Sequence, residues 1–251
     1  TPLIQSFALT ERIARPVYLK LETVHDVGAF KVRGAANKIL NLSEKEKQRG
    51  VATYSTGNHG IAVAYIANRL GIEAVVCISK MVPKAKVNVL KQLKAKVEMI
   101  GESQDEAAEH CRKLNKQYGY TIIPPFDDPD VIAGQGTIGL EIIEDLPFVS
   151  DIVIPLSGGG LLSGVGMVLK TMNPAIRVSG VSMECGAAMY ESLKAGKPVK
   201  AIEQETLADS LRGGIGLNNQ FTFSMVKEYM DEIHLVSELE IAKSIQFMIE
   251  V

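Results

Sequence analysis

The sequence predicts an α/β fold in which mostly parallel sheets are covered by helices on both faces. Segments typical of strands alternate with segments typical of helices, which is the order that parallel sheets require. The segment 73–79 (EAVVCIS) is a continuous apolar run, as expected for a strand buried on both faces. Small polar or glycine-rich loops follow strands and begin helices, where such sheets bind ligands. We therefore expect two doubly wound, three-layer domains.

The first half of the chain carries the clearest alternation. Its predicted strands cover 17–21, 51–54, 73–79, 96–100 and 120–123, and the helices between them cover 32–42, 58–70, 84–94 and 103–118. Segment 58–70, for example, has apolar residues at helical spacing and ends at Gly71, a typical helix terminator. Two prolines and an acidic run at 124–130 then indicate a domain edge.

The second half repeats the pattern. We expect helices at 131–146, 160–171, 186–194 and 238–251, strands at 151–156, 176–183 and 232–236, and a loop with a short helix at 205–216. The predicted organisation is a discontinuous large domain, 1–49 with 128–251, and a small domain, 50–127.

Composition excludes several classes of protein. The 251 residues are 46% hydrophobic, and the net charge of −2 indicates neither a nucleic-acid nor a membrane partner. No segment resembles a signal peptide or a membrane span. Three cysteines form neither a metal-binding spacing nor a disulfide framework, which predicts a cytoplasmic protein. The chain starts without methionine and stops within an apolar helical pattern, which is typical of a fragment or of the ordered part of a longer protein.

Lys31 is unusual because it lies where the loop 28–30 becomes a helix. A helix amino terminus disfavours a cation by about 0.3–1 kcal/mol. Burial would also lower the pKa of the amine and favour its neutral form. A neutral amine is what imine formation with a carbonyl requires. The competing interpretation, a solvated surface lysine, would be preferred on this segment alone.

Two further loops have the composition of anion-binding sites. Segment 55–60 (STGNHG) follows a strand and begins a helix, so its N–H groups can hold a carboxylate or a phosphate, although a plain helix cap would use the same residue types. We interpret His59 as a structural or hydrogen-bonding residue rather than a general base. Segment 157–161 (SGGGL) places three glycines at a strand–helix junction, which favours a phosphate cradle over a flexible turn.

Two more motifs carry less chemistry. Segment 132–137 (IAGQGT) has two glycines near a helix start, which indicates close backbone packing. Segment 208–216 (ADSLRGGIG) is a glycine-rich loop from which no chemistry follows on physical grounds.

These motifs, in this order and spacing, resemble the fold type II pyridoxal-phosphate enzymes, whose fold is similar to the tryptophan synthase beta chain. GAFKVRGA, STGNHG, IAGQGT and SGGGLLSG are most similar to those of the threonine/serine dehydratase and serine racemase group. The resemblance covers essentially the whole chain. The late stretch ADSLRGGIGLNNQFTF resembles dehydratases of ectoine and hydroxyectoine utilisation.

The resemblance implies a role for each matched residue. Lys31 would carry pyridoxal phosphate covalently and act in catalysis, and Phe30 would lie beneath the cofactor ring. Asn58 would bind the ring hydroxyl oxygen. The cofactor phosphate would bind the backbone of Ser157, Gly158, Gly159, Gly160 and Leu161. The substrate carboxylate would bind Ser55, Thr56, Gly57, Asn58 and His59.

The chain also departs from the family pattern. Ala29 stands where many relatives have serine, and Thr56 stands where racemases have a serine that serves as the acid and base on the second face. Glu184 matches a metal-binding glutamate of some relatives, but Tyr190 stands where an aspartate would follow, so we expect no metal site. The family residue that pairs with the pyridine nitrogen would fall beyond Val251.

The resemblance implies a lyase that removes water and ammonia from a β-hydroxy amino acid, with Lys31 and Thr56 as the catalytic candidates and a homodimer as the assembly. Fold does not fix reaction. A racemase, a β-replacement enzyme and a dehydratase of ectoine or hydroxyectoine degradation remain alternatives on the same fold. A non-catalytic protein that binds a phosphate ligand is the alternative from another class.

Overall fold

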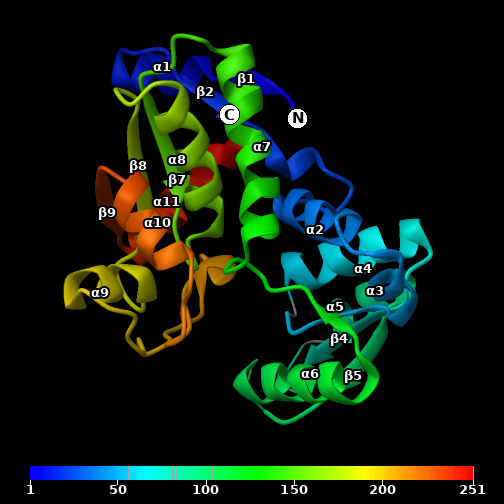
Figure 1. The fold of residues 1–251 in the computed structure, drawn as a ribbon. Helices are drawn as coiled ribbons and strands as arrows, with labels where there is room; N and C mark the ends of the chain where they lie inside the picture. Colours follow the sequence, from blue (N-terminus) through cyan, green and yellow to red (C-terminus); the bar gives the residue numbers. More distant parts are fainter. Residues whose placement is uncertain (56, 81, 83, 103, 251) are drawn as a thin grey trace. The chain divides into compact units, whose positions relative to one another are not determined.

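The computed structural model describes residues 1–55, 57–80, 82, 84–102 and 104–250 (Figure 1). The chain forms two compact units: Thr1–Glu22 with Gln135–Val251, and Thr23–Gly134. We call the second the Lys31 unit and the first the glycine-loop unit, after the segments that they carry. The domain boundaries expected from the sequence, after residues 49 and 127, stay a prediction.

The Lys31 unit is built on a parallel sheet of four strands. The strand order is β5-β4-β3-β6, with β3 (Val51–Thr53), β4 (Ala74–Ile78), β5 (Lys96–Met99) and β6 (Thr121–Ile122). Every residue of β4 is buried, as its continuous apolar sequence predicts. Successive side chains of a strand point to opposite faces, so the apolar residues divide between two cores.

Helices cover both faces of this sheet, which confirms the predicted layers. On one face α2 (Lys31–Leu40), α4 (Asn58–Leu70) and α5 (Lys84–Gln92) share a core with β3 and β4. On the other face α6 (Gln104–Tyr118) packs against β3 and β4. α3 (Glu44–Arg49) begins with a capping box between Ser43 and Glu46, which satisfies backbone donors at its first turn.

The glycine-loop unit is built on a second parallel sheet. The order is β7-β8-β9, with β7 (Asp151–Pro155), β8 (Arg177–Met183) and β9 (Glu232–Val236). Its helices are α8 (Gly160–Met172), α9 (Ala188–Ala195), α10 (Thr222–Tyr229) and α11 (Glu238–Glu250), with a short 3-10 helix η2 (Asp209–Leu211). α7 (Pro129–Asp145) contains the boundary between the units.

The amino-terminal segment forms a small antiparallel sheet, of which the sequence predicts one strand. β1 (Leu3–Gln5) pairs antiparallel with β2 (Tyr18–Lys20), the predicted strand, and α1 (Phe7–Ile13) connects them. A 3-10 helix η1 (Glu22–Val24) follows. None of the helices in the described part of the chain has both the length and the apolar character that a membrane crossing requires.

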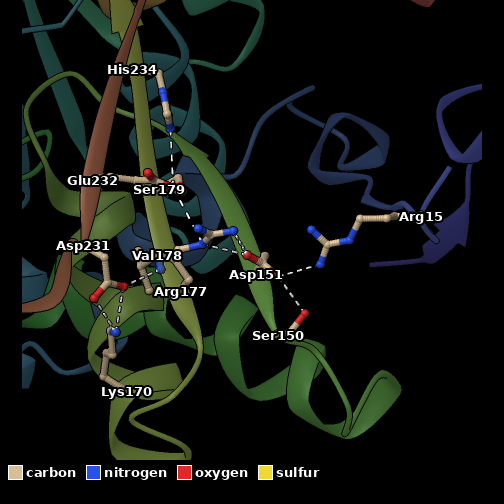
Figure 2. Close-up of polar contacts among 10 residues, drawn as sticks. All are labelled: Arg15, Ser150, Asp151, Lys170, Arg177, Val178, Ser179, Asp231, Glu232 and His234. Atoms are coloured by element: carbon tan, nitrogen blue, oxygen red, sulfur yellow. Dashed lines mark hydrogen bonds and ion pairs between the residues drawn. The ribbon is translucent and has the colours of Figure 1, made fainter. Parts of the chain in front are cut away.

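A polar cluster lies where the strands of the second sheet begin (Figure 2). The Arg177 guanidinium bonds Asp151 at 2.7 Å, and Arg15 bonds the other oxygen of this carboxylate at 3.2 Å. Hydrogen bonds from Ser150 and Arg177 lower the pKa of Asp151 to about 2. The ligand loops of such sheets follow the carboxyl ends of the strands, which is the opposite end. We therefore assign this cluster a structural role in the sheet.

Candidate functional site

Lys31 is the first residue of α2, as the sequence predicts. Phe30 precedes it and provides no side-chain cap for the helix. Lys31 is half-buried, and its Nζ donates a hydrogen bond to the Pro125 carbonyl at 2.7 Å. Burial lowers the pKa of the Lys31 amine from 10.5 to about 8. At pH 7 a larger fraction of the amine is therefore neutral than at the ordinary pKa. Burial thus makes the nucleophilic form more accessible near neutral pH, although the charged form still predominates.

His59 lies on α4 in the same unit and is fixed as a neutral ring. Its Nε2 lies 2.9 Å from the Ile123 carbonyl, which also accepts a bond from Thr53 at 2.9 Å. Since a carbonyl only accepts, Nε2 must carry the proton. Burial, helped by the nearby charge of Lys31, lowers the pKa of His59 to about 3.

The other ring nitrogen of His59, Nδ1, has no hydrogen-bond partner among the described residues and is buried. A buried acceptor without a partner carries a desolvation cost of about 1–3 kcal/mol. Nδ1 thus keeps the capacity to accept a hydrogen bond. The Nε2 bond to Ile123 is a structural hydrogen bond, and the role of His59 toward a substrate stays a prediction.

The loop before α4 leaves backbone donors open. Gly57 precedes the helix, and no side chain of the described residues caps its first turn. The loop is closed tightly, since a Cβ on Gly60 would lie 2.0 Å from the Ser55 carbonyl oxygen. Free N–H groups at a helix start form an anion site. Thr56 lies outside the described residues, so the structure assigns no position to this predicted catalytic residue.

The glycine loop of the other unit has the features of a phosphate cradle. Gly159 adopts a left-handed conformation with φ 88°, and α8 begins at Gly160 without a side-chain cap. A Cβ on Gly159 would lie 2.8 Å from Met189 and 2.9 Å from Val226. Both the backbone angle and the contacts therefore require glycine at this position. Ser157 is turned to the Leu211 carbonyl, to which its hydroxyl donates at 2.9 Å.

Each unit by itself fits one part of a phosphate-bearing aldehyde cofactor. The Lys31 unit provides a desolvated amine for the aldehyde and an unpartnered acceptor on His59. The glycine-loop unit provides open N–H groups at the start of a 13-residue helix for the phosphate. The donor sets therefore fit such a group.

Sequence reasoning missed the carbonyl groups that hold these side chains. The Ile123 carbonyl bonds His59 and the Pro125 carbonyl bonds Lys31, whereas the sequence predicts only a strand at 120–123 and a domain edge at 124–130. Every residue has a backbone carbonyl, so the residue type does not indicate such a role. The close packing predicted for 132–137 is observed, since a Cβ on Gly134 would lie 2.5 Å from the Arg33 carbonyl oxygen.

The absence of a metal site at Glu184 stays a prediction. Glu184 is exposed, and its N–H bonds the Val236 carbonyl at 2.9 Å. In the described ranges, no three His, Cys, Asp or Glu residues gather in a way that could hold an ion.

Comparison with known sequences gives close relatives. The chain matches the family of pyridoxal-phosphate dependent enzymes over residues 1–250. It is 47% identical over 250 residues to a putative threonine dehydratase of Sinorhizobium fredii, covering 100% of this chain and 75% of that protein. It is 43% identical over 250 residues to an L-threonine ammonia-lyase of Thermotoga maritima, covering 100% of this chain and 62% of that protein.

Solved structures give a similar result. Maize serine racemase has a TM-score of 0.94 and 31% identity, covering 100% of this chain and 75% of that one. The processed form of threonine deaminase isoform 2 from Solanum lycopersicum has a TM-score of 0.89 and 37% identity, covering 94% of this chain and 65% of that one. The chain thus spans only part of the length of each relative.

Proposed function

The chain belongs to the family of pyridoxal-phosphate dependent enzymes, and from this premise we propose that it is a lyase that removes water and ammonia from L-threonine or L-serine. The β-hydroxyl leaves as water and gives an enamine, whose imine tautomer takes up water and yields ammonia and a 2-oxo acid. The observation that carries the proposal is Lys31, whose amine is desolvated at the head of α2. The identity to an L-threonine ammonia-lyase, 43% across the whole chain, supports the substrate class.

Each matched residue has one task in this proposal. Pyridoxal phosphate, when bound, supplies an electron sink for the negative charge that develops on the substrate α-carbon. Lys31 would hold the cofactor aldehyde through Nζ, and the same atom would accept the α-proton of the substrate. Phe30 supports the cofactor ring. Asn58 donates to the ring hydroxyl oxygen.

The two open helix starts bind the anionic groups. The backbone N–H groups of 55–59 orient the substrate carboxylate, and those of 157–161 hold the cofactor phosphate. Orientation matters because a misplacement of about 1 Å can cost on the order of a hundredfold in rate. Neutral His59 accepts a hydrogen bond at Nδ1 without adding charge beside Lys31.

The proposal is tested with Lys31→Ala and, as a matched control, Lys45→Ala at an exposed position of α3. L-threonine and L-serine are supplied with cofactor, and 2-oxo acid and ammonia are measured. Turnover should disappear in the first variant only, and borohydride should fix the cofactor to the Lys31 peptide. Fixation to another lysine, or turnover without Lys31, would contradict the assignment.

A racemase is the second candidate, because maize serine racemase has a TM-score of 0.94 to this chain. Racemisation needs a proton donor on the second face, and the candidate Thr56 has a branched side chain with restricted χ1. We expect 2-oxo acid to exceed D-amino acid, and Thr56→Ser to raise the D-isomer fraction. Chiral separation of the products decides, since faster formation of D-serine than of pyruvate would support the racemase.

Two further alternatives give different outcomes in the same assay. Turnover of ectoine-derived hydroxy amino acids alone would keep the elimination and assign the chain to ectoine or hydroxyectoine degradation. Cofactor binding without turnover of any substrate would support a non-catalytic binder of a phosphate ligand.

Assembly and location complete the proposal. We propose a homodimer, since two-fold dimers are the commonest soluble oligomers, and light scattering on the purified protein tests it. We propose a cytoplasmic location because Cys77, Cys111 and Cys185 are all free thiols, which suits a reducing compartment. Cell fractionation with an antibody tests this.

A further inference from the structure

The stretch 208–223 includes the segment 208–216, from which no chemistry followed on physical grounds, and it contacts the glycine loop in two places. At one end, the Leu211 carbonyl accepts the hydrogen bond of Ser157 at 2.9 Å. At the other end, Thr222 Cβ lies 3.1 Å from where a Cβ on Gly159 would be. Ile215, between them, is 2% exposed. The stretch thus lies against the backbone that presents the cradle N–H groups.

Asn219 holds the turn that leads into α10. Its Nδ2 donates to the Ile215 carbonyl at 3.0 Å and to Thr222 Oγ1 at 2.7 Å. Its Oδ1 accepts the N–H of Phe223 at 2.8 Å. One side chain therefore bonds the turn behind it, the first residue of α10 and the backbone of the next residue. Only an amide of this length has both donors and an acceptor so arranged.

The first turns of α10 in turn limit the position of Gly159. Thr222 and Val226 are fully buried, and Val226 Cγ2 lies 2.9 Å from the Cβ position of Gly159. Protein interiors are close-packed, so a shift of α10 is transmitted to whatever it contacts. The glycine that needs a left-handed φ thus has α10 as one of its walls.

We propose that Asn219 is a positioning residue for the cofactor phosphate. It fixes the start of α10 against Gly159 and so sets the direction of the N–H groups at the start of α8. The inference rests on the proposed role of 157–161 as the phosphate cradle. The proposed role of Asn219 is to raise the affinity for the phosphate group. This is different from a general contribution to folding.

The experiment compares pyridoxal phosphate with pyridoxal, which lacks the phosphate, in binding titrations of the cofactor-free protein followed by absorbance. Asn219→Ala should lower the affinity for pyridoxal phosphate about tenfold, which corresponds to about 1.4 kcal/mol, and leave the affinity for pyridoxal unchanged. Thr222→Val, which keeps the side-chain volume and removes the hydroxyl, should act in the same direction and provides the answer if Asn219→Ala does not fold. Asn218→Ala, at an exposed neighbour, is the matched control and should change neither affinity.

The outcomes separate the two proposals. Equal affinity of the unchanged protein for both ligands would remove the cradle assignment and, with it, the role of Asn219. A preference for the phosphate form that persists in Asn219→Ala would leave the cradle intact and overturn the role of Asn219 alone. An equal loss of affinity for both ligands would also overturn the role of Asn219, because Asn219 would then support only the general structure. A shift of the bound-phosphate ³¹P resonance in Asn219→Ala but not in Asn218→Ala supports the proposal.

Discussion

Desolvation determines the chemistry of Lys31 at the scale of single residues. Its pKa of about 8 places the change from charged to neutral amine within reach of ordinary assays. Acylation reacts only with the neutral amine, so labelling of Lys31 in the cofactor-free protein should rise with pH and reach its midpoint near pH 8. Competitive labelling read by mass spectrometry gives this midpoint. A midpoint near the ordinary 10.5 would show that the amine is solvated.

His59 makes a second prediction at this scale, which concerns stability. Burial lowers the pKa of its ring from 6.5 to about 3 in the folded protein. Between these values the unfolded chain binds a proton that the folded chain does not, so stability rises with pH and falls as the solution is acidified. The contribution is at most about 1.4 kcal/mol per pH unit.

The measurement is the free energy of unfolding from denaturant titrations between pH 4 and 6. In His59→Gln, the part of the change in unfolding free energy with pH that comes from His59 should disappear. His234→Gln, at an exposed position, is the control and should keep it. An unchanged slope in His59→Gln would mean that the ring is already protonated in the folded protein.

The tight loop before α4 gives a prediction at the scale of elements. Alanine normally stabilises a helix relative to glycine by up to about 1 kcal/mol. At Gly60, however, the added Cβ would lie 2.0 Å from the Ser55 carbonyl oxygen. Overpacking of this kind typically costs about 1–3 kcal/mol, so it outweighs the helix propensity.

Gly60→Ala should therefore lower the melting temperature and raise KM for L-threonine, because the displaced loop is the proposed carboxylate site. Gly214→Ala is the control, since the nearest atom to its added Cβ is 3.9 Å away. A Gly60→Ala variant as stable and as active as the control would show that the loop tolerates a different path.

Elements with a strong local pattern were predictable, and those that depend on long-range contacts were not. Helix 58–70 was predicted with the bounds of α4, because its apolar face and Gly71 are local signals. α1 and α3 were missed because they are short and bury no residue. The order β5-β4-β3-β6 joins segments far apart in the sequence, so periodicity carries no information about it.

The candidate site shows the same division. Lys31 and the glycine loop stood out because a cation at a helix start and three successive glycines are unusual in themselves. The partners Ile123, Pro125 and Leu211 act through backbone carbonyls, which are the same in every residue type. Asn219 gave no signal, because its three hydrogen bonds depend on a turn that only the folded chain forms.

At the scale of the whole molecule, the two possible divisions of the chain predict different folding behaviour. The Lys31 unit, Thr23–Gly134, is one continuous segment with its own sheet and two cores. The small domain expected from the sequence, 50–127, would lack α2. In the structure α2 contributes fully buried Ala35 and Ile39 to the core that covers α4. Burial of one such isoleucine is worth about 1.5–3 kcal/mol.

We therefore expect the segment 23–134 to fold by itself and the segment 50–127 to fail. Without α2, part of the core that α2 shares with α4 would be exposed to water, and a net stability of only about 0.1 kcal/mol per residue does not tolerate such a loss. Circular dichroism with urea titration should show one cooperative transition for 23–134 and none for 50–127. A cooperative transition in 50–127 of the same midpoint would place the boundary after residue 49, as the sequence alone predicts, and would make α2 a part of the other unit.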